Sequence, residues 1–212
     1  CENINLDHKN ELLRFCNTKN IDLVIIGPEQ YLENGLSDYL KSKNIKVFGP
    51  SKKASKLETS KSFAKKFLKR NKINTAKYKE FSSYESAKKY VSLLKYPIVV
   101  KVDGLAAGKG VIICKNKKEA EVSLSLIMKK KKFGSSGNKI IIEEFLEGYE
   151  VSYFAFFDKN SFLKLGYALD HKKAYDNDNG PNTGGMGCFL PSKKITKKIE
   201  EDIYKKILLP TS

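Results

Sequence analysis

The feature that most constrains this chain is a glycine-rich run at residues 101–110 (KVDGLAAGKG), which lies between two short apolar segments. The flanking segments, residues 97–102 (PIVVKV) and 111–114 (VIIC), have the composition and length of buried strands. Because glycine and alanine leave the backbone of the run without side-chain cover, its N–H groups can approach phosphate oxygens closely. The sequence therefore predicts a strand–loop–strand hairpin over phosphates, built on Gly104, Gly108 and Gly110, with Lys101 and Lys109 supplying positive charge.

Two other glycine-rich phosphate loops do not fit this run. A P-loop has four residues between its first glycine and the Gly-Lys pair and then a serine or threonine, whereas here three residues intervene and Gly110 follows Lys109. A dinucleotide-binding loop opens a helix, but a strand-forming segment follows here. The alternative without a ligand is a flexible hairpin turn, although the run is longer than a tight turn requires.

The first fifty residues have the pattern of parallel α/β structure. Residues 21–26 (IDLVII) and 47–48 predict strands, and residues 11–16 and 35–40 predict helices. We interpret residues 1–50 as the end of a doubly wound domain. Ligands bind at strand ends in such sheets, so Pro28 and Glu29 are candidate substrate contacts, and an ordinary turn at this position is an equal alternative.

The remaining residues mix helices with strands, which is typical of an α+β domain. Helices are predicted at residues 51–71, 84–94, 117–131 and 196–209. Further strands are predicted at residues 139–145, 151–157 and 162–169, and a polar glycine-rich loop at residues 176–187. The predicted fold class is thus α/β followed by α+β.

The chain is strongly basic, with 40 Lys plus Arg against 24 Asp plus Glu and a net charge of +16. A general bias toward lysine explains this charge best, because nucleic-acid binders usually rely on arginine and no zinc-finger, RNP or basic-zipper pattern is present. A lysine-rich cleft would also suit a polyphosphate ligand. The four cysteines form no metal pattern, and neither a secretory signal nor an apolar run of about 20 residues occurs. We therefore expect a cytoplasmic protein without membrane or nucleic-acid partners.

Four sequence blocks together resemble the phosphoribosylamine–glycine ligase family of ATP-grasp enzymes. In chain order they are FGPSKKASKLETSK, PIVVKVDGLAAGKGV, IIIEEFLEGYEVS and DHKKAYDNDNGPNTGGMG. The resemblance runs from about Val24 to Pro191. It implies that residues 1–50 end a pre-ATP-grasp domain and that residues 51–212 form an incomplete ATP-grasp domain, with a lid subdomain at about residues 75–148.

The resemblance also implies a reaction, in which ATP-dependent ligation of glycine to 5-phosphoribosylamine through a glycyl phosphate gives glycinamide ribonucleotide, ADP and phosphate. The expected cofactors are ATP and Mg²⁺, with Mn²⁺ as an alternative. The family's metal ligands are expected beyond residue 212, so none is assigned within this chain, and the segment alone is expected to be inactive. Another ATP-grasp carboxylate–amine ligase and, less favoured, a basic nucleic-acid-binding module are the rival interpretations.

The resemblance assigns the nucleotide site to residues in the first three blocks. An ammonium group inside an apolar strand needs an anion, and the family places the residue matching Lys101 on the phosphates. Lys61 has the same role, together with the glycine loop. The hinge that meets the adenine edge corresponds to Glu143, Glu144, Phe145 and Leu146, and the ribose-binding acid to Glu150. The alternative is that these glutamates are solvent-exposed acids in a loop and bind no nucleotide.

The fourth block is the candidate substrate segment. Lys172 is expected to neutralise the transferring phosphoryl group and is, with Lys101, the candidate catalytic residue. The resemblance also implies that further residues of this block contact the substrates: Asp170, His171, Asn182, Thr183, Gly184, Gly185 and Met186.

Overall fold

The computed structural model describes residues 3–159, 161–176 and 179–212. Contacts divide the chain into two units. The first unit comprises Cys1–Phe67 with Lys77–Glu144, and the second comprises Leu68–Ala76 with Phe145–Ser212.

A four-stranded antiparallel sheet lies at the centre of the first unit. Its strand order is β3–β6–β4–β5. The strands are β3 (Tyr78–Phe81), β4 (Ile98–Val102), β5 (Val111–Cys114) and β6 (Ile140–Glu144). The predicted hairpin around the glycine run is confirmed, because β4 pairs with β5 in antiparallel register, with Lys101 opposite Val111.

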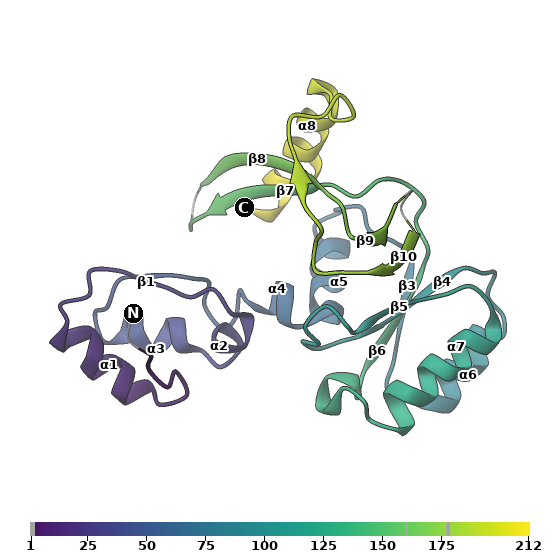
Figure 1. Cartoon of the computed structure of the whole chain (residues 1–212), viewed down its shortest axis with the longest axis horizontal. Helices are drawn as coiled ribbons and strands as arrows, with labels where there is room; N and C mark the ends of the chain where they lie inside the picture. The colour runs from purple at the N-terminus through teal and green to yellow at the C-terminus, as the bar shows by residue number, and fades with distance from the viewer. Residues whose placement is uncertain (1–2, 160, 177–178) are drawn as a thin grey trace. The chain divides into compact units, whose positions relative to one another are not determined.

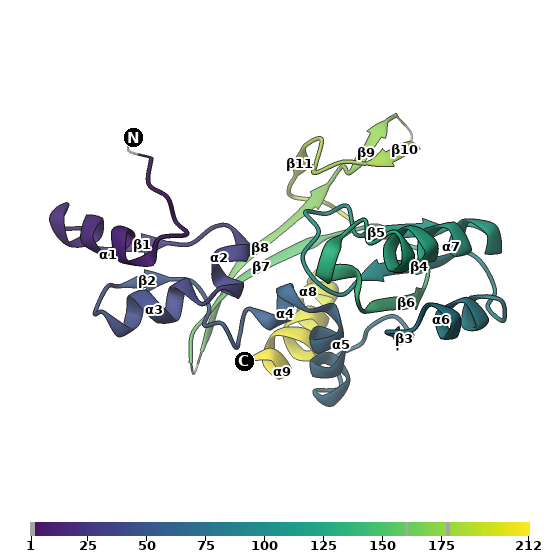
Figure 2. The ribbon, with the colours of Figure 1, turned by 90° about the horizontal axis from the view of Figure 1, so that it is seen from below.

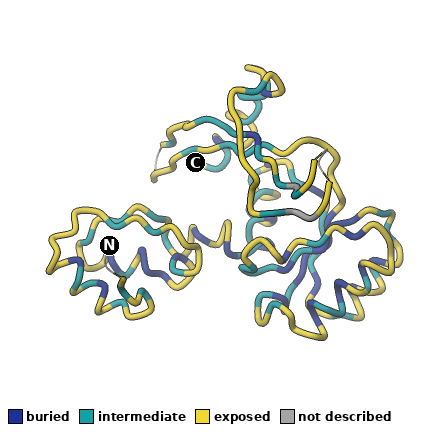
Figure 3. The backbone as a smooth tube through the Cα atoms, in the orientation of Figure 1, coloured by how far each residue is buried: buried dark blue, intermediate teal, exposed yellow. Residues whose placement is uncertain are grey.

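One face of this sheet is apolar and is covered by two helices. Alternate residues of β4 and β6, such as Val100 and Ile142, are almost fully buried against α6 (Tyr84–Val91) and α7 (Lys117–Leu124). Figure 1 shows these two helices side by side, and Figure 3 shows buried segments in both the strands and the helices. Serine and asparagine caps start the two helices. After α7 the helix continues as a π-helix, η1 (Ser125–Lys129), within the helix predicted at residues 117–131.

The amino-terminal part has parallel α/β structure, as predicted. β1 (Val24–Ile25) and β2 (Val47–Phe48) pair in parallel. Three helices, α1 (Lys9–Thr18), α2 (Glu29–Glu33) and α3 (Leu36–Ser42), accompany them. The strand predicted over residues 21–26 is shorter than expected, because the N–H of Ile21 bonds to the carbonyl of Cys16 at 2.9 Å and so closes the end of α1.

The single helix predicted over residues 51–71 is wrong. The structure has two helices, α4 (Lys56–Thr59) and α5 (Lys61–Arg70). Ser60 between them has extended backbone angles, φ −140° and ψ 106°. The break has a tertiary cause: the N–H of Lys61 donates to the carbonyl of Asp103 at 3.0 Å, so it is turned away from the preceding helix.

The second unit contains a three-stranded sheet with the order β11–β8–β7. Figure 2 shows β7 (Ser152–Phe157) and β8 (Phe162–Asp170) running beside each other as a long ribbon, and β11 (Cys188–Phe189) pairs with the end of β8. The loop predicted over residues 176–187 is partly wrong, because β10 (Asn179–Asn182) pairs with β9 (Lys173–Tyr175) within it.

The chain ends in a helical segment that matches the helix predicted over residues 196–209. It consists of α8 (Lys197–Ile203), the π-helix η3 (Tyr204–Leu208) and α9 (Leu209–Thr211). Its first turn is capped by the hydroxyl of Thr196, which accepts from the N–H of Ile199. Within the described residues, no helix is both long and apolar enough to cross a membrane.

Candidate functional site

The second face of the four-stranded sheet in the first unit is charged. Side chains alternate between the two faces of a strand, so Val99 and Lys101 of β4 share a face. Glu143 of β6 lies opposite Val99, which makes it a diagonal neighbour of Lys101 on that face. Glu80 of β3 lies opposite Ile141 and therefore belongs to the same face. One face of the sheet is therefore apolar, while the charged face holds Lys101, Glu143 and Glu80 together with the buried Val99 and Ile141.

A buried carboxylate organises the charged face. The Glu143 side chain is only 4% exposed, and its Oε2 lies 2.9 Å from Nζ of Lys101. Its Oε1 lies 3.1 Å from Nζ of Lys65, which comes from α5 and is also buried. The expected anion for Lys101 in this structure is therefore a protein carboxylate. The interpretation of Glu143 as an exposed loop acid is wrong.

Lys61 lies one helical turn before Lys65 on α5, close to the same cluster. Its Nζ donates to the carbonyl oxygen of Gly104 at 3.3 Å. Burial lowers the pKa of Lys61, and the positive charge of Lys101 lowers it further, while Glu58, Asp103 and Glu143 oppose this shift. The two ammonium groups expected to contact phosphates thus lie near enough to repel each other.

The glycine loop is anchored at both ends of the β4–β5 hairpin. The N–H of Val102 donates to the carbonyl of Gly110 at 2.9 Å. Gly110 must be glycine, because a Cβ there would lie 2.4 Å from Cγ2 of Val102. Gly108 has φ +74° and open space around it, so its requirement is conformational. Lys109 is exposed, and its N–H donates to the carbonyl of Ala106 at 2.9 Å.

The predicted hinge residues lie at the end of β6 and directly after it. Glu143 is paired with Tyr78 on one side and Val99 on the other, so its main chain belongs to the sheet. The N–H of Glu144 donates to the carbonyl of Lys77 at 3.0 Å. The side chains of Phe145 and Leu146, which begin the second unit, are exposed.

The second unit brings Glu150 and Lys172 together. Nζ of Lys172 donates to Oε1 of Glu150 and lies 3.7 Å from Oδ2 of Asp170. The hydrogen bond to Glu150 raises the pKa of Lys172, although partial burial opposes the shift. Lys172 therefore remains an ammonium group throughout the physiological pH range.

The predicted substrate segment forms one tight cluster within the second unit. The N–H of His171 donates to the carbonyl of Gly187 at 2.9 Å, and the N–H of Met186 donates to the carbonyl of His171 at 2.7 Å. Thr183 donates from both its N–H and its hydroxyl to the carbonyl of Lys172. Gly185 has φ +133° beside Asp170. These contacts bring residues 170–172 and 183–187 together.

Other predicted positions stand apart from these clusters. Pro28 is the N-cap of α2, and Glu29 is its first residue. The imidazole ring of His171 stacks on Phe189, with ring centroids 5.4 Å apart. Gly184 is exposed, and the Asn182 side chain lies outside the described part of the chain.

The sequence did not single out Lys65 or Asp103. Lys65 lies four residues after Lys61, and this spacing places both on one helix face, which was a usable signal. Asp103 directly follows the last residue of β4. The spacing of Lys65 is not specific in a chain with so many lysines, and a position at the end of a strand does not by itself identify Asp103. In residues 3–159, 161–176 and 179–212, no three His, Cys, Asp or Glu side chains gather in a way that could hold a metal ion.

Two family models match the chain along its whole length. The phosphoribosylglycinamide synthetase N domain matches residues 1–58. The ATP-grasp (A) domain of the same family matches residues 59–212. Together the models account for both the parallel α/β segment and the structure that follows it.

Individual relatives agree with the family models. A phosphoribosylamine–glycine ligase of Clostridium acetobutylicum is 43% identical over 211 residues, which are 100% of this chain and 51% of the relative. The crystal structure of phosphoribosylamine–glycine ligase from Thermotoga maritima superposes with a TM-score of 0.69 at 35% identity, over 88% of this chain and 46% of that one.

A third likeness concerns the fold alone. The biotin carboxylase domain of Hydrogenobacter thermophilus 2-oxoglutarate carboxylase, solved with MgADP, ADP and bicarbonate, has a TM-score of 0.74 at 20% identity, covering 99% of this chain and 46% of that chain. The present chain spans about half the length of the ligases that it matches. From the family models and the identity to its relatives, the chain belongs to the phosphoribosylglycinamide synthetase family.

Proposed function

We propose that the protein containing this chain joins glycine to 5-phosphoribosylamine at the expense of ATP. A carboxylate oxygen of glycine attacks the γ-phosphorus of ATP, and the bond to the bridging oxygen of ADP breaks. The amine of phosphoribosylamine then attacks the acyl carbon of the glycyl phosphate, loses a proton and expels phosphate. The product is glycinamide ribonucleotide.

The observation that carries this proposal is the pair of ammonium groups beside the glycine loop. Lys61 and Lys101 repel each other, and burial disfavours the charged form of Lys61. A polyphosphate next to Gly104 relieves both penalties, because it supplies negative charge to both lysines. The loop residues that follow, with Gly108 in a left-handed conformation, leave backbone open to a phosphate group.

The similar proteins support ATP as the phosphoryl donor. The matching ATP-grasp family model covers both lysines and the loop, and the Hydrogenobacter domain of the same fold was solved with MgADP. Mg²⁺ is the proposed metal, with Mn²⁺ as the alternative. The described residues bring no set of three His, Cys, Asp or Glu side chains together as ligands for it.

The second unit supplies the remaining proposed roles. Lys172 neutralises charge on the transferring phosphoryl group, which an ammonium with a raised pKa can do without losing its proton. Glu150 accepts hydrogen bonds from the ribose hydroxyls. Its hydrogen bond from Lys172 must then break so that the sugar can take its place. The cluster of residues 170–172 and 183–187 holds the substrates, and the main chain after Glu144 meets the adenine edge.

We further propose the domain arrangement and setting that the family implies. Residues 1–50 end the amino-terminal α/β domain, residues 51–212 belong to the ATP-grasp domain, and about residues 75–148 form its lid. The protein acts on small molecules in the cytoplasm, and its basic surface binds no nucleic acid.

The test is ADP release by the full-length protein. Release that requires both glycine and phosphoribosylamine, with glycinamide ribonucleotide as product, supports the proposal. Release supported by another carboxylate or amine, but not by this pair, points to a different ATP-grasp ligase and contradicts it. Stabilisation against heat by an oligonucleotide but not by an ATP analogue favours the nucleic-acid interpretation instead.

A further inference from the structure

We propose that Asp103 is a positioning residue, which holds the start of helix α5 against the base of the glycine loop so that Lys61 and the loop meet the same phosphate group. The inference rests on the proposed nucleotide site. It assigns Asp103 no contact with the substrate, because Asp103 acts through Lys61 and through the loop.

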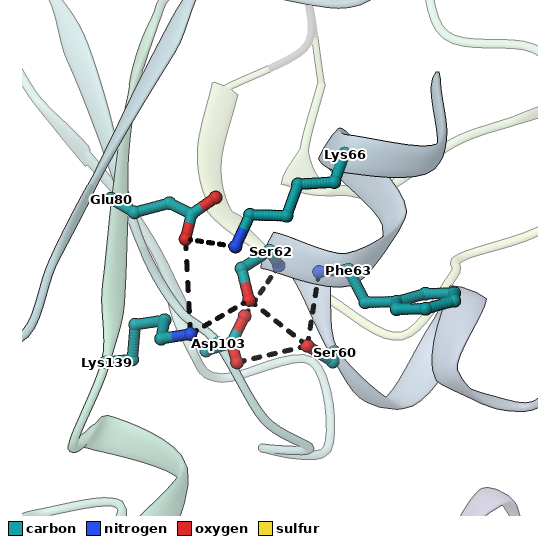
Figure 4. Close-up of polar contacts among 7 residues, drawn as sticks. All are labelled: Ser60, Ser62, Phe63, Lys66, Glu80, Asp103 and Lys139. Atoms are coloured by element: carbon teal, nitrogen blue, oxygen red, sulfur yellow. Dashed lines mark hydrogen bonds and ion pairs between the residues drawn. The ribbon is translucent and has the colours of Figure 1, made fainter. Parts of the chain in front are cut away.

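The carboxylate of Asp103 is divided between two groups at the start of α5 (Figure 4). Its Oδ1 accepts from the backbone N–H of Ser62 at 2.6 Å, and its Oδ2 accepts from the hydroxyl of Ser60 at 3.1 Å. Its own carbonyl accepts from the N–H of Lys61 at 3.0 Å. The first N–H groups of a helix have no partner within the helix. For the N–H of Ser62, Asp103 is the acceptor, although it lies 41 residues further along the sequence.

The backbone of Asp103 and of the next residue is hydrogen-bonded to the segment before β6, the strand that neighbours β4. The N–H of Asp103 donates to the carbonyl of Lys139 at 3.0 Å, and the N–H of Gly104 donates to the carbonyl of Ser136 at 3.3 Å. A Cβ on Gly104 would lie 2.7 Å from Oγ of Ser136, so the two segments touch. Asp103 therefore joins three segments, the loop base, α5 and the turn before β6.

The same contacts bring the Lys61 side chain to the loop. Nζ of Lys61 donates to the carbonyl of Gly104, the residue that follows Asp103. A carboxylate at a helix start also interacts favourably with the helix dipole. With Glu58 and Glu143, the charge of Asp103 supports the ammonium form of Lys61 against burial and against Lys101. Position and charge state of Lys61 thus both depend on Asp103.

The experiment compares Asp103→Asn and Asp103→Ala with Asp38→Asn and Asp38→Ala in the full-length protein. Asp38 is a matched control, because its Oδ2 also accepts a backbone N–H, from Lys52 at 2.8 Å, but it does not contact Lys61 or the loop. ATP affinity is measured by calorimetry across pH, KM and kcat by ADP release, and the thermal midpoint by fluorescence.

We expect Asp103→Ala to weaken ATP binding by about tenfold or more, which corresponds to one charge-assisted hydrogen bond. Asp103→Asn keeps an oxygen for Ser62, so it recovers part of the affinity. It also removes a charge that supports the Lys61 ammonium, so its loss of ATP affinity with rising pH begins at lower pH than in the wild type. The Asp38 variants lower only the thermal midpoint.

Two results would overturn the proposal. One is an unchanged ATP affinity in both Asp103 variants despite a lower thermal midpoint, which identifies a purely structural cap. The other is an Asp103→Asn pH profile that coincides with the wild type. If the wild type binds ATP but makes no glycinamide ribonucleotide, the proposed reaction fails, while the affinity comparison still decides the role of Asp103.

Discussion

Lys101 and Glu143 form an ion pair between neighbouring strands, with Nζ of Lys101 2.9 Å from Oε2 of Glu143. The pair lies on the charged face of the sheet, and Lys65 contacts the other carboxylate oxygen at 3.1 Å. A single buried acid thus sets the positions of two lysines from different elements. The Lys101 side chain is still 27% exposed, so the ion pair with Glu143 does not bury it completely.

Removal of the Lys101 ammonium should weaken ATP binding. We expect Lys101→Ala in the full-length protein to lower the affinity about tenfold or more, because a hydrogen bond to a charged group contributes about 1.5–3 kcal/mol. Lys130→Ala removes an exposed lysine next to the π-helix and serves as the control. Calorimetric titration measures both, and equal losses in the two variants would contradict the role of Lys101.

Removal of the Glu143 charge should destabilise the first unit. In Glu143→Gln, two ammonium groups lose the carboxylate between them, and breaking a buried pair in this way costs about 3 kcal/mol or more. Glu144→Gln is the matched control for stability, since the neighbouring side chain is exposed and accepts from the N–H of Lys77. Urea unfolding with equal midpoints for the two variants would show that the buried pair contributes little.

A side chain at Gly108 should slow phosphoryl transfer while leaving the fold intact. A Cβ there meets nothing within 4 Å, so the effect of Gly108→Val comes from its left-handed φ of +74°. Gly134→Val imposes a similar strain at φ +53°, also in open space, but outside the loop. Single-turnover formation of ADP measures the difference. Normal rates for Gly108→Val, or equal slowing by both variants, would argue against a role for the loop conformation.

The lowered pKa of Lys61 predicts a pH-dependent affinity. Burial favours the neutral amine, so Lys61 loses its proton at lower pH than an exposed lysine and ATP affinity falls as the pH rises. Lys61→Arg keeps its charge throughout this range, so we expect its affinity to change less with pH. Titrations from neutral to alkaline pH check this, and parallel curves for the two proteins would exclude Lys61 as the titrating group.

Strands β4, β5 and β6 could be predicted from local sequence, whereas β3, which lies in a stretch without a strand prediction, and the charged cluster could not. Apolar runs located β4 and β6 to within a residue or so, because burial on at least one face requires such runs. The break at Ser60 was missed since its cause, Asp103, is 43 residues away. A local pattern contains no information about such a contact, and the polar residues that make it are ordinary helix-start residues.

Within the candidate substrate segment, residues that share one sequence block also lie close together in the structure. Asp170 and Gly185 belong to the same block and lie side by side, with the Gly185 backbone next to the Asp170 carboxylate. Glu143, in contrast, was assigned an exposed or backbone role. Its burial depends on two lysines from other segments, and the sequence offers 38 lysines among 40 basic residues. Composition alone could not identify the two that pair with it.

The double anchoring of the glycine loop limits the entropy that ligand binding must overcome. Asp103 and Gly104 are bonded to the turn before β6, and Gly110 is bonded to Val102. Only residues 105–109 can therefore be ordered when the loop contacts a ligand. Fixing the backbone costs about 1–2 kcal/mol per residue, so the entropic penalty of ordering these residues stays below about 10 kcal/mol. Ordering a long free lid would cost more. In the proposed function, a short, tethered loop of this kind suits repeated turnover, because it needs no large compensating contacts to close on a phosphate and release it.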